Sequence, residues 1–337
     1  MKEPVRRTNH PWMVGVCVAA IAAAYFFLLG NSNFPEPGPN LTYDIETYAK
    51  VDQVETRYEE TGLIVPDLEE PEALAVGPDG RLYVAGLNAV AVFGKDDTEV
   101  ARFETNGAAK CIAVADDGTI FLGFPEHVEV VGKDGAVQAV WPEIGPRAFL
   151  TSIAVLEDDV YVADAGNRVV YRFDREGNLL ARIGEIDLEE DIPGIEVPSP
   201  YLDLAVNDEG NLWVVNPGRL GLERYRADGS IVTSWYKPSV VKLEGFSGCC
   251  NPTHIAFSND GKLITSEKGL VRIKVYDVTY GEFEELVAGS KLFPRGQSLK
   301  DLVVDAGDRI LVLDPRINAV RIFERKEDDH GTTGQST

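Results

Sequence analysis

A short pattern recurs six times along this chain and constrains its fold more than any other feature. Each copy begins with an apolar triplet, typically Leu/Ile-Ala-Val, which is followed by a tight turn rich in Gly, Asp and Asn. The six triplets occupy residues 74–76, 112–114, 153–155, 204–206, 255–257 and 302–304. A second alternating apolar segment follows each turn, as in Leu212-Trp213-Val214. Copies of this kind, spaced by 38 to 51 residues, predict a repeated antiparallel sheet.

The repeat unit has the length and the spacing of turns that a four-stranded sheet requires. A third strand follows in every copy, for example at 169–173, and most copies continue through an acidic-Gly turn into a fourth. Such units are typical of β-propeller blades, which pack around a common axis because a single blade cannot bury both of its faces. The sixth copy ends after its third strand, at Phe323, and a strand-like segment at 55–65 precedes the first copy. We therefore predict an all-β, six-bladed β-propeller over residues 55–325, closed by that N-terminal strand.

The third copy carries a resemblance to a known family. Residues 162–173 read Val-Ala-Asp-Ala-Gly-Asn-Arg-Val-Val-Tyr-Arg-Phe, and Asp314, Asn318 and Arg321 repeat part of this pattern in the sixth copy. On these residues the chain resembles the NHL-repeat family of six-bladed propellers. The resemblance implies the same fold, and it implies no particular activity.

An uncharged segment at residues 12–30 predicts a transmembrane helix. Nineteen residues at 1.5 Å each span about 28 Å, close to the hydrocarbon thickness of a bilayer. Lys2, Arg6 and Arg7 precede this segment, so the positive-inside rule places residues 1–11 in the cytoplasm. The rest of the chain is then extracytoplasmic, either periplasmic or at the cell surface.

The alternative to a single-pass signal anchor is a cleaved signal peptide. The small-residue site is Ala22-Ala23-Ala24, and cleavage there would leave an apolar new N-terminus beginning at Tyr25. We therefore expect residues 12–30 to remain as an anchor. Residues 31–54 are predicted to form a Pro-rich linker, and residues 326–337 a disordered tail.

Charge and cysteine content exclude several classes of function. The formal net charge of −23 disfavours a nucleic-acid partner, because phosphates would be repelled rather than neutralised. Besides Cys17 in the anchor, the chain has Cys111, Cys249 and Cys250, with no C-x-x-C-H motif and no paired C-x-x-C motif. Covalent haem attachment and the common zinc and iron–sulfur motifs are thus absent from the sequence.

The residue just before each apolar triplet is expected at one mouth of the central channel, because the first strand of a blade lines the axis. In ring order these residues are Ala73, Cys111, Ser152, Asp203, His254 and Asp301. Three successive blades thus offer Asp203, His254 and Asp301, and one imidazole with two carboxylates can hold a divalent metal ion. The alternative interpretation is a set of polar residues around a water-filled channel.

The adjacent cysteines lie in residues 245–261, directly before the fifth apolar triplet. Cys249 and Cys250 could form a vicinal disulfide in an oxidising compartment, or one of them could pair with Cys111. They could also remain thiols or bind a metal ion with His254. The sequence leaves these alternatives open.

Two long insertions, at residues 184–200 and 236–251, are expected on the mouth side of the ring. Long loops on a rigid scaffold are common sites of recognition. The sequence therefore favours a membrane-tethered module that binds a protein or carbohydrate partner through the mouth side of its channel. The alternative is a metal-dependent hydrolase or lyase, or a redox accessory protein, with its site at the channel mouth. Since no Ser-His-Asp arrangement, P-loop or dinucleotide fingerprint occurs, the sequence favours a binding module over an enzyme.

Overall fold

The computed structural model describes residues 50–186, 189, 193–207, 209–294 and 296–327. The expected cytoplasmic segment and signal anchor lie outside the described residues, as do most of the linker and of the tail. Among the residues that are described, no helix has the length and apolar character needed to cross a membrane.

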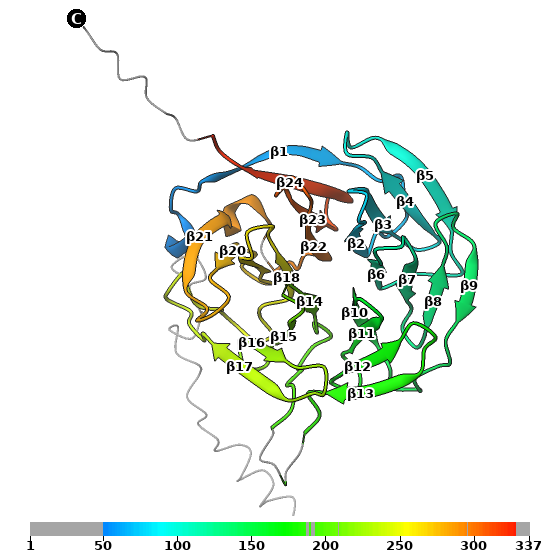
Figure 1. The fold of residues 1–337 in the computed structure, drawn as a ribbon. Helices are drawn as coiled ribbons and strands as arrows, with labels where there is room; N and C mark the ends of the chain where they lie inside the picture. The colour runs from blue at the N-terminus through cyan, green and yellow to red at the C-terminus, as the bar shows by residue number, and fades with distance from the viewer. Residues whose placement is uncertain (1–49, 187–188, 190–192, 208, 295, 328–337) are drawn as a thin grey trace, which may run out of the picture. The chain divides into compact units, whose positions relative to one another are not determined.

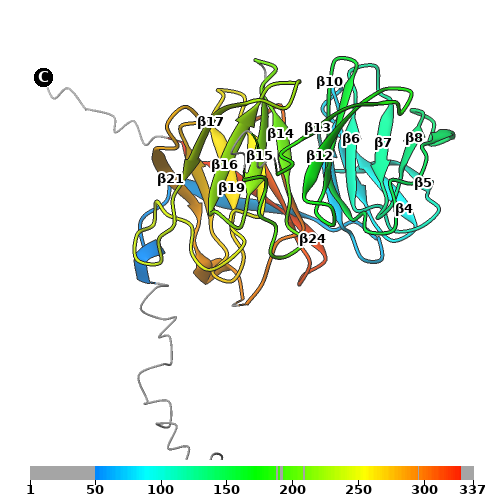
Figure 2. The ribbon, with the colours of Figure 1, turned by 90° about the horizontal axis from the view of Figure 1, so that it is seen from below.

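Six four-stranded antiparallel sheets stand around a common axis in the described part of the chain (Figure 1; Figure 2 gives a view at right angles). The first blade holds β2 (Ala73–Val76), β3 (Leu82–Ala85), β4 (Ala89–Phe93) and β5 (Glu99–Glu104). The second holds β6 (Cys111–Val114), β7 (Ile120–Gly123), β8 (Val128–Val131) and β9 (Val137–Val140). The third holds β10 (Leu150–Leu156), β11 (Asp159–Asp164), β12 (Val169–Asp174) and β13 (Leu179–Ile183).

The remaining blades follow the same order from the axis outward. The fourth blade holds β14 (Leu204–Val206), β15 (Leu212–Asn216), β16 (Gly221–Tyr225) and β17 (Ile231–Tyr236). The fifth holds β18 (His254–Phe257), β19 (Leu263–Ser266), β20 (Ile273–Tyr276) and β21 (Phe283–Ala288). The sixth holds β22 (Asp301–Val304), β23 (Ile310–Asp314) and β24 (Ala319–Arg325), with β1 (Tyr58–Ile64) outside them. Two 3₁₀ helices, η2 (Lys50–Asp52) and η3 (Ser290–Leu292), lie between strands or before them.

The ring is closed by the first strand of the propeller. β1 pairs antiparallel with β24, with Ile64 opposite Val320, and Figure 1 shows the blue β1 beside the red β24. This pairing covers the edge that β24 would otherwise expose. The all-β, six-bladed propeller expected from the repeats is confirmed, and so is its closure by the segment before the first repeat.

The hydrophobic core lies between neighbouring blades. The largest cluster joins Trp213 and Leu222 of the fourth blade to Tyr161 of the third and Tyr276 of the fifth. Small residues sit nearest the axis, so that Ala205 lies opposite the much larger Trp213 one strand further out. This gradient suits wedge-shaped blades, because the gap between two blades widens with distance from the axis.

Asp164 explains why the third repeat carries the sequence Asp-Ala-Gly-Asn. Its buried carboxylate accepts hydrogen bonds from the backbone N–H groups of Gly166 (2.9 Å), Asn167 (3.0 Å) and Phe149 (2.9 Å). It therefore shapes its own turn and also holds the loop that precedes β10. Gly166 is needed because a Cβ there would lie 1.9 Å from the Arg147 carbonyl oxygen. The motif therefore stabilises this turn and the loop before β10.

Candidate functional site: the channel mouth

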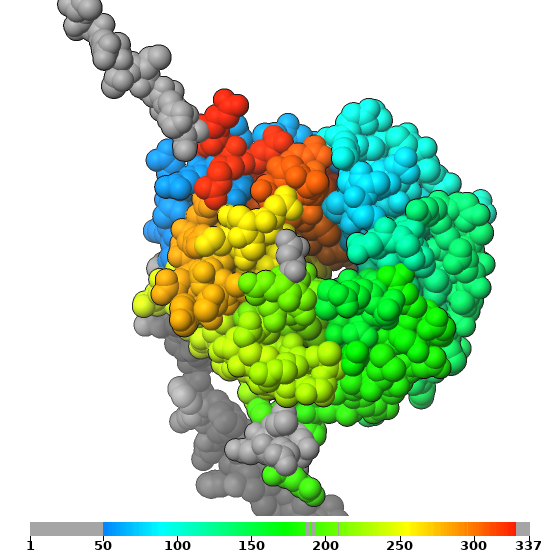
Figure 3. Space-filling view, viewed as in Figure 1, coloured from blue at the N-terminus to red at the C-terminus, as the bar shows by residue number. Residues whose placement is uncertain are grey.

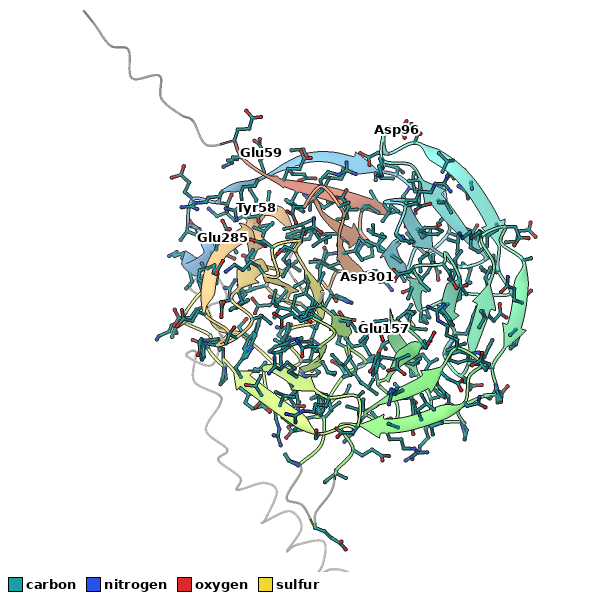
Figure 4. The ribbon with its side chains drawn as sticks, viewed as in Figure 1. Tyr58, Glu59, Asp96, Glu157, Glu285 and Asp301 are labelled. Atoms are coloured by element: carbon teal, nitrogen blue, oxygen red, sulfur yellow. The ribbon has the colours of Figure 1, made fainter. Side chains whose placement is uncertain are left out.

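The inner strands border a central channel of about 320 Å³. Figure 3 shows an opening near the axis of the ring, and Figure 4 places Asp301 on the inner edge of its blade beside that opening. Cys111, Ser152, Asp203 and Asp301 line the channel, as their position before the apolar triplets predicted. His254 instead lines a second cavity, of about 220 Å³, at the mouth itself.

Asp203 and Asp301 connect neighbouring blades. One carboxylate oxygen of Asp203 accepts the Leu204 N–H (2.9 Å), and the other accepts the Ile255 N–H of the next blade (2.7 Å). Asp301 repeats the arrangement: it accepts the N–H of Leu302 (2.7 Å) and that of Leu74 in the first blade (2.7 Å). Both carboxylates therefore have a structural role between inner strands.

His254 is held between a carbonyl group and a carboxylate. Its Nε2 lies 3.2 Å from the Leu299 carbonyl oxygen, so Nε2 carries the proton and donates it. Its Nδ1 lies 3.9 Å from Asp203 Oδ2. Burial lowers the pKa of His254 more than Asp203 raises it, which favours the neutral ring. The Tyr201 ring meets the imidazole edge-on at 6.4 Å.

Burial also shifts the acids of the channel toward their neutral forms. It raises the pKa of Asp301 to about 8, with a further contribution from the charge of Asp203. The pKa of Asp203 is raised by burial as well, and that of the Cys111 thiol is raised by burial and by both carboxylates. The charge of Asp301 is therefore expected to change near neutral pH.

This shift predicts a pH-dependent stability. Between its ordinary pKa of 3.8 and about 8, Asp301 holds a proton in the folded protein that the unfolded chain has lost. Its contribution to stability is thus present at low pH and is lost as the pH rises through this interval. We expect the free energy of unfolding of the wild type to fall, relative to Asp301→Asn, by at least about 1 kcal/mol between pH 5 and pH 8. Urea denaturation of both proteins measures it, and parallel pH profiles would contradict the assignment.

The side-chain atoms expected to bind a metal ion already form hydrogen bonds within the protein. Each oxygen of Asp203 and of Asp301 accepts a backbone N–H, and one nitrogen of His254 bonds a carbonyl oxygen. Within the described ranges, no three His, Cys, Asp or Glu side chains converge in a way that would hold a metal ion. As arranged here, these residues do not fit a divalent ion.

The adjacent cysteines lie outside this site. Cys111 is buried in the channel wall, whereas neither Cys249 nor Cys250 lines the channel or the mouth cavity. All three are free thiols in the structure, with Cys249 exposed and Cys250 buried. Asn251 fixes their loop, since it donates to the Ser247 carbonyl (2.6 Å) and accepts the Lys268 N–H (2.8 Å). The vicinal disulfide stays a prediction, which alkylation without reductant and mass spectrometry would test.

The mouth cavity is lined by a second ring of residues that the sequence interpretation missed. They occupy one equivalent position in all six blades, one residue before the positions singled out above. This mouth ring consists of Glu72, Lys110, Thr151, Leu202, Thr253 and Lys300. Shifting the repeat register back by one residue would have identified them, because that position already carries three charged side chains.

The mouth ring concentrates positive charge. Glu72 accepts hydrogen bonds from both Lys110 (3.1 Å) and Lys300 (2.7 Å), so that one carboxylate is shared by two ammonium groups. A third ammonium group, of Lys268, lies 4.6 Å from the centroid of the Tyr201 ring at the cavity wall. Two lysines and one glutamate thus line the mouth cavity, and Lys268 lies behind its Tyr201 wall, in a chain whose formal charge is −23.

A buried ionic network, also missed from the sequence, supports the loop beside the mouth. Lys274 Nζ lies 2.9 Å from Glu267 Oε1 and donates to the carbonyl oxygens of Leu243 (3.1 Å) and Gly245 (2.9 Å). Arg272 Nε pairs with Asp52, from the segment before β1, at 3.1 Å. The network thus joins the 237–251 loop and the N-terminal segment to the fifth blade.

Comparisons with known proteins agree with the fold. The family model described as "Strictosidine synthase-like, N-terminal" matches residues 63–88. No curated protein matches the chain. Among solved structures, a streptogramin B lyase is 12% identical with a TM-score of 0.57, covering 80% of this chain and 99% of its own. The WD40 propeller domain of Doa1 is also similar, with 12% identity and a TM-score of 0.54, covering 80% of this chain and 98% of its own. Virginiamycin B lyase from Staphylococcus aureus is 14% identical with a TM-score of 0.53, covering 80% of this chain and 99% of its own. Together they support a β-propeller family, and at these identities they establish the fold alone.

Proposed function

We propose that this chain is a membrane-tethered, extracytoplasmic NHL-type propeller that binds an acidic protein partner at its channel mouth. One observation carries the proposal: lysines gather around the mouth cavity of a strongly acidic chain. Because the chain has 55 acidic and 32 basic residues, a random distribution would on average place more carboxylates than ammonium groups there. Complementary charge of this kind guides association and selects partners.

The chemistry of the mouth suits carboxylate side chains. Lys110 and Lys300 present ammonium groups that Glu72 only partly neutralises. Thr151 and Ser298 add hydroxyl groups to the lining, and Tyr201 adds an aromatic edge. The raised pKa values of Asp203 and Asp301 reduce the negative charge directly below. An acidic loop or chain end of a protein would gain ion pairs here, whereas a neutral saccharide would leave the lysines unused.

The tether and the binding face are tested together by photo-crosslinking. The full-length chain, carrying p-benzoylphenylalanine in place of Tyr201, is irradiated in intact cells, and the membrane fraction is then collected. We expect the chain in that fraction, joined to a protein whose capture poly-L-glutamate suppresses and polyglutamine does not. The same probe in place of Asp117, on the opposite face, should capture none of it.

Three outcomes would count against the proposal. Recovery of the intact chain in the soluble fraction would contradict the membrane attachment. Equal capture from both probe positions would contradict binding at the channel mouth. A captured polysaccharide would replace the protein partner by a carbohydrate.

The alternative is a metal-dependent hydrolase or lyase, or a redox accessory protein. It is supported by the lyases among the structural neighbours and by the approach of His254 to Asp203. The present bonds of Asp203, Asp301 and His254 would have to break to free a ligand set. Elemental analysis of the purified chain and of His254→Ala decides this: stoichiometric metal lost in the variant would favour the alternative.

A further inference from the structure

A groove of about 400 Å³ lies between the fourth and fifth blades, on the face opposite the channel mouth. Its described borders are Asn207 and Glu209 after β14, the turn that follows β18, and residues 278–280 between β20 and β21. Its walls are partly aromatic, from Trp213, Phe257 and Tyr280. Its volume is in the range of small-molecule sites. The groove is separate from the mouth ring, so its occupant is independent of the function proposed above.

Arg224 lines this groove without a charged partner. Its guanidinium lies 5.9 Å from the centroid of the Trp213 ring, and its buried Nε has no hydrogen-bond acceptor within the described part of the chain. No carboxylate oxygen of the described residues lies within ion-pair distance of it. Because it has no charged partner among the described residues, the Arg224 guanidinium still has N–H groups that can bind an anion.

The third blade provides an internal comparison, because Arg172 occupies the register position of Arg224. Arg172 lies opposite Tyr161 on the neighbouring strand, just as Arg224 lies opposite Trp213. Arg172 Nε, however, pairs with Asp159 at 2.8 Å.

The position equivalent to Asp159 in the fourth blade is Asn211, which carries no charge. Its amide donates to Glu209 Oε2 at 3.0 Å and so is turned to another partner. The fourth blade therefore keeps the arginine of this row and lacks its counter-ion.

A second unused donor lies in the same wall. Trp213 is 1% exposed, and its Nε1 has no hydrogen-bond acceptor among the described residues. Buried indole N–H groups usually have a partner. The Trp213 N–H is enclosed by the protein, as are those of Trp141 and Trp235, so the donor that this wall offers to a ligand is the guanidinium of Arg224.

We propose that this groove binds a small organic monocarboxylate whose carboxylate pairs with Arg224 and whose apolar or aromatic body packs against Phe257 and Tyr280. A planar guanidinium suits a planar carboxylate, which it can bind through two parallel hydrogen bonds. Glu209 and Asp260 at the groove disfavour multiply charged anions such as phosphate. The aromatic walls favour a ligand that buries apolar surface over acetate.

The test is calorimetric titration of the purified full-length protein with phenylacetate, acetate and inorganic phosphate. We expect saturable binding of phenylacetate, and binding at least about tenfold weaker for the other two. Arg224→Met should weaken phenylacetate binding at least about tenfold, the effect of losing one charge-assisted interaction. The matched control Arg172→Met should bind as the wild type does.

Tyr280→Ala keeps the test decisive if Arg224→Met does not fold. Tyr280 is 74% exposed, so its removal should leave the fold intact while it weakens phenylacetate binding severalfold. Absence of saturable phenylacetate binding to the wild type overturns the proposal. So does phosphate binding as tightly as phenylacetate, or binding that neither Arg224→Met nor Tyr280→Ala weakens.

Discussion

Lys274→Met should lower the free energy of unfolding by about 3–5 kcal/mol, the cost of removing one partner from a buried ion pair. The Lys274 side chain has no exposed surface, and neither has that of Glu267, 2.9 Å away. Methionine matches the length of lysine, so the loss arises from charge and hydrogen bonding rather than from a cavity. The Leu243 and Gly245 carbonyl groups also lose their donor, so the loop that leads to Cys249 and Cys250 loses two of its hydrogen bonds to the fifth blade.

Urea denaturation followed by tryptophan fluorescence measures this change. Trp235 is a local reporter because its ring stacks on Phe246, which lies 4.5 Å from the Lys274 ammonium group. Lys262→Met is the control, since it breaks an exposed ion pair with Glu284 and should cost less than about 1 kcal/mol. The double variant Lys274→Met/Glu267→Gln should recover part of the loss. A loss under about 1 kcal/mol for Lys274→Met would show that the network does not stabilise the fold.

The fold was predictable because its determinants are local and repeated. Apolar triplets, αL-tolerant turns and a missing sixth outer strand each specify one property of a propeller, and together they gave the blade number and the closure. The pairing of β1 with β24 needed no side-chain information, because the unpaired edge has one free segment to cover it.

The candidate site was predictable only as a position. Register placed Asp203 and Asp301 at the channel, but it could not show that their carboxylates would bind the backbone of the next blade. Side-chain direction at a strand end depends on the neighbouring blade, which a single repeat does not encode. The lysines of the mouth ring were missed for a related reason, since lysine is not a usual metal ligand and these two lie one register position before the candidate metal ligands.

Replacing the mouth lysines should abolish most of the affinity for acidic ligands. In Lys110→Met/Lys268→Met/Lys300→Met, three ammonium groups leave the mouth while Glu72 remains, so the cavity becomes anionic. Loss of two or three partly solvated charge contacts predicts affinity about 10- to 100-fold weaker. The effect should shrink as salt is raised, because screening acts over about 10 Å at 0.1 M. Glu72→Gln, which frees the lysines that Glu72 now holds, should strengthen binding.

The most direct test is isothermal titration of the full-length protein with a hexaglutamate peptide at low salt. The matched control removes as much charge from the opposite face, through Lys95→Met/Lys133→Met/Lys262→Met. The account predicts saturable binding to the wild type and to this control, with tighter binding to Glu72→Gln and loss in the mouth variant. Equal weakening in both triple variants would mean that net charge, rather than the channel mouth, attracts the ligand. That result, or no binding to the wild type, would contradict recognition at the mouth.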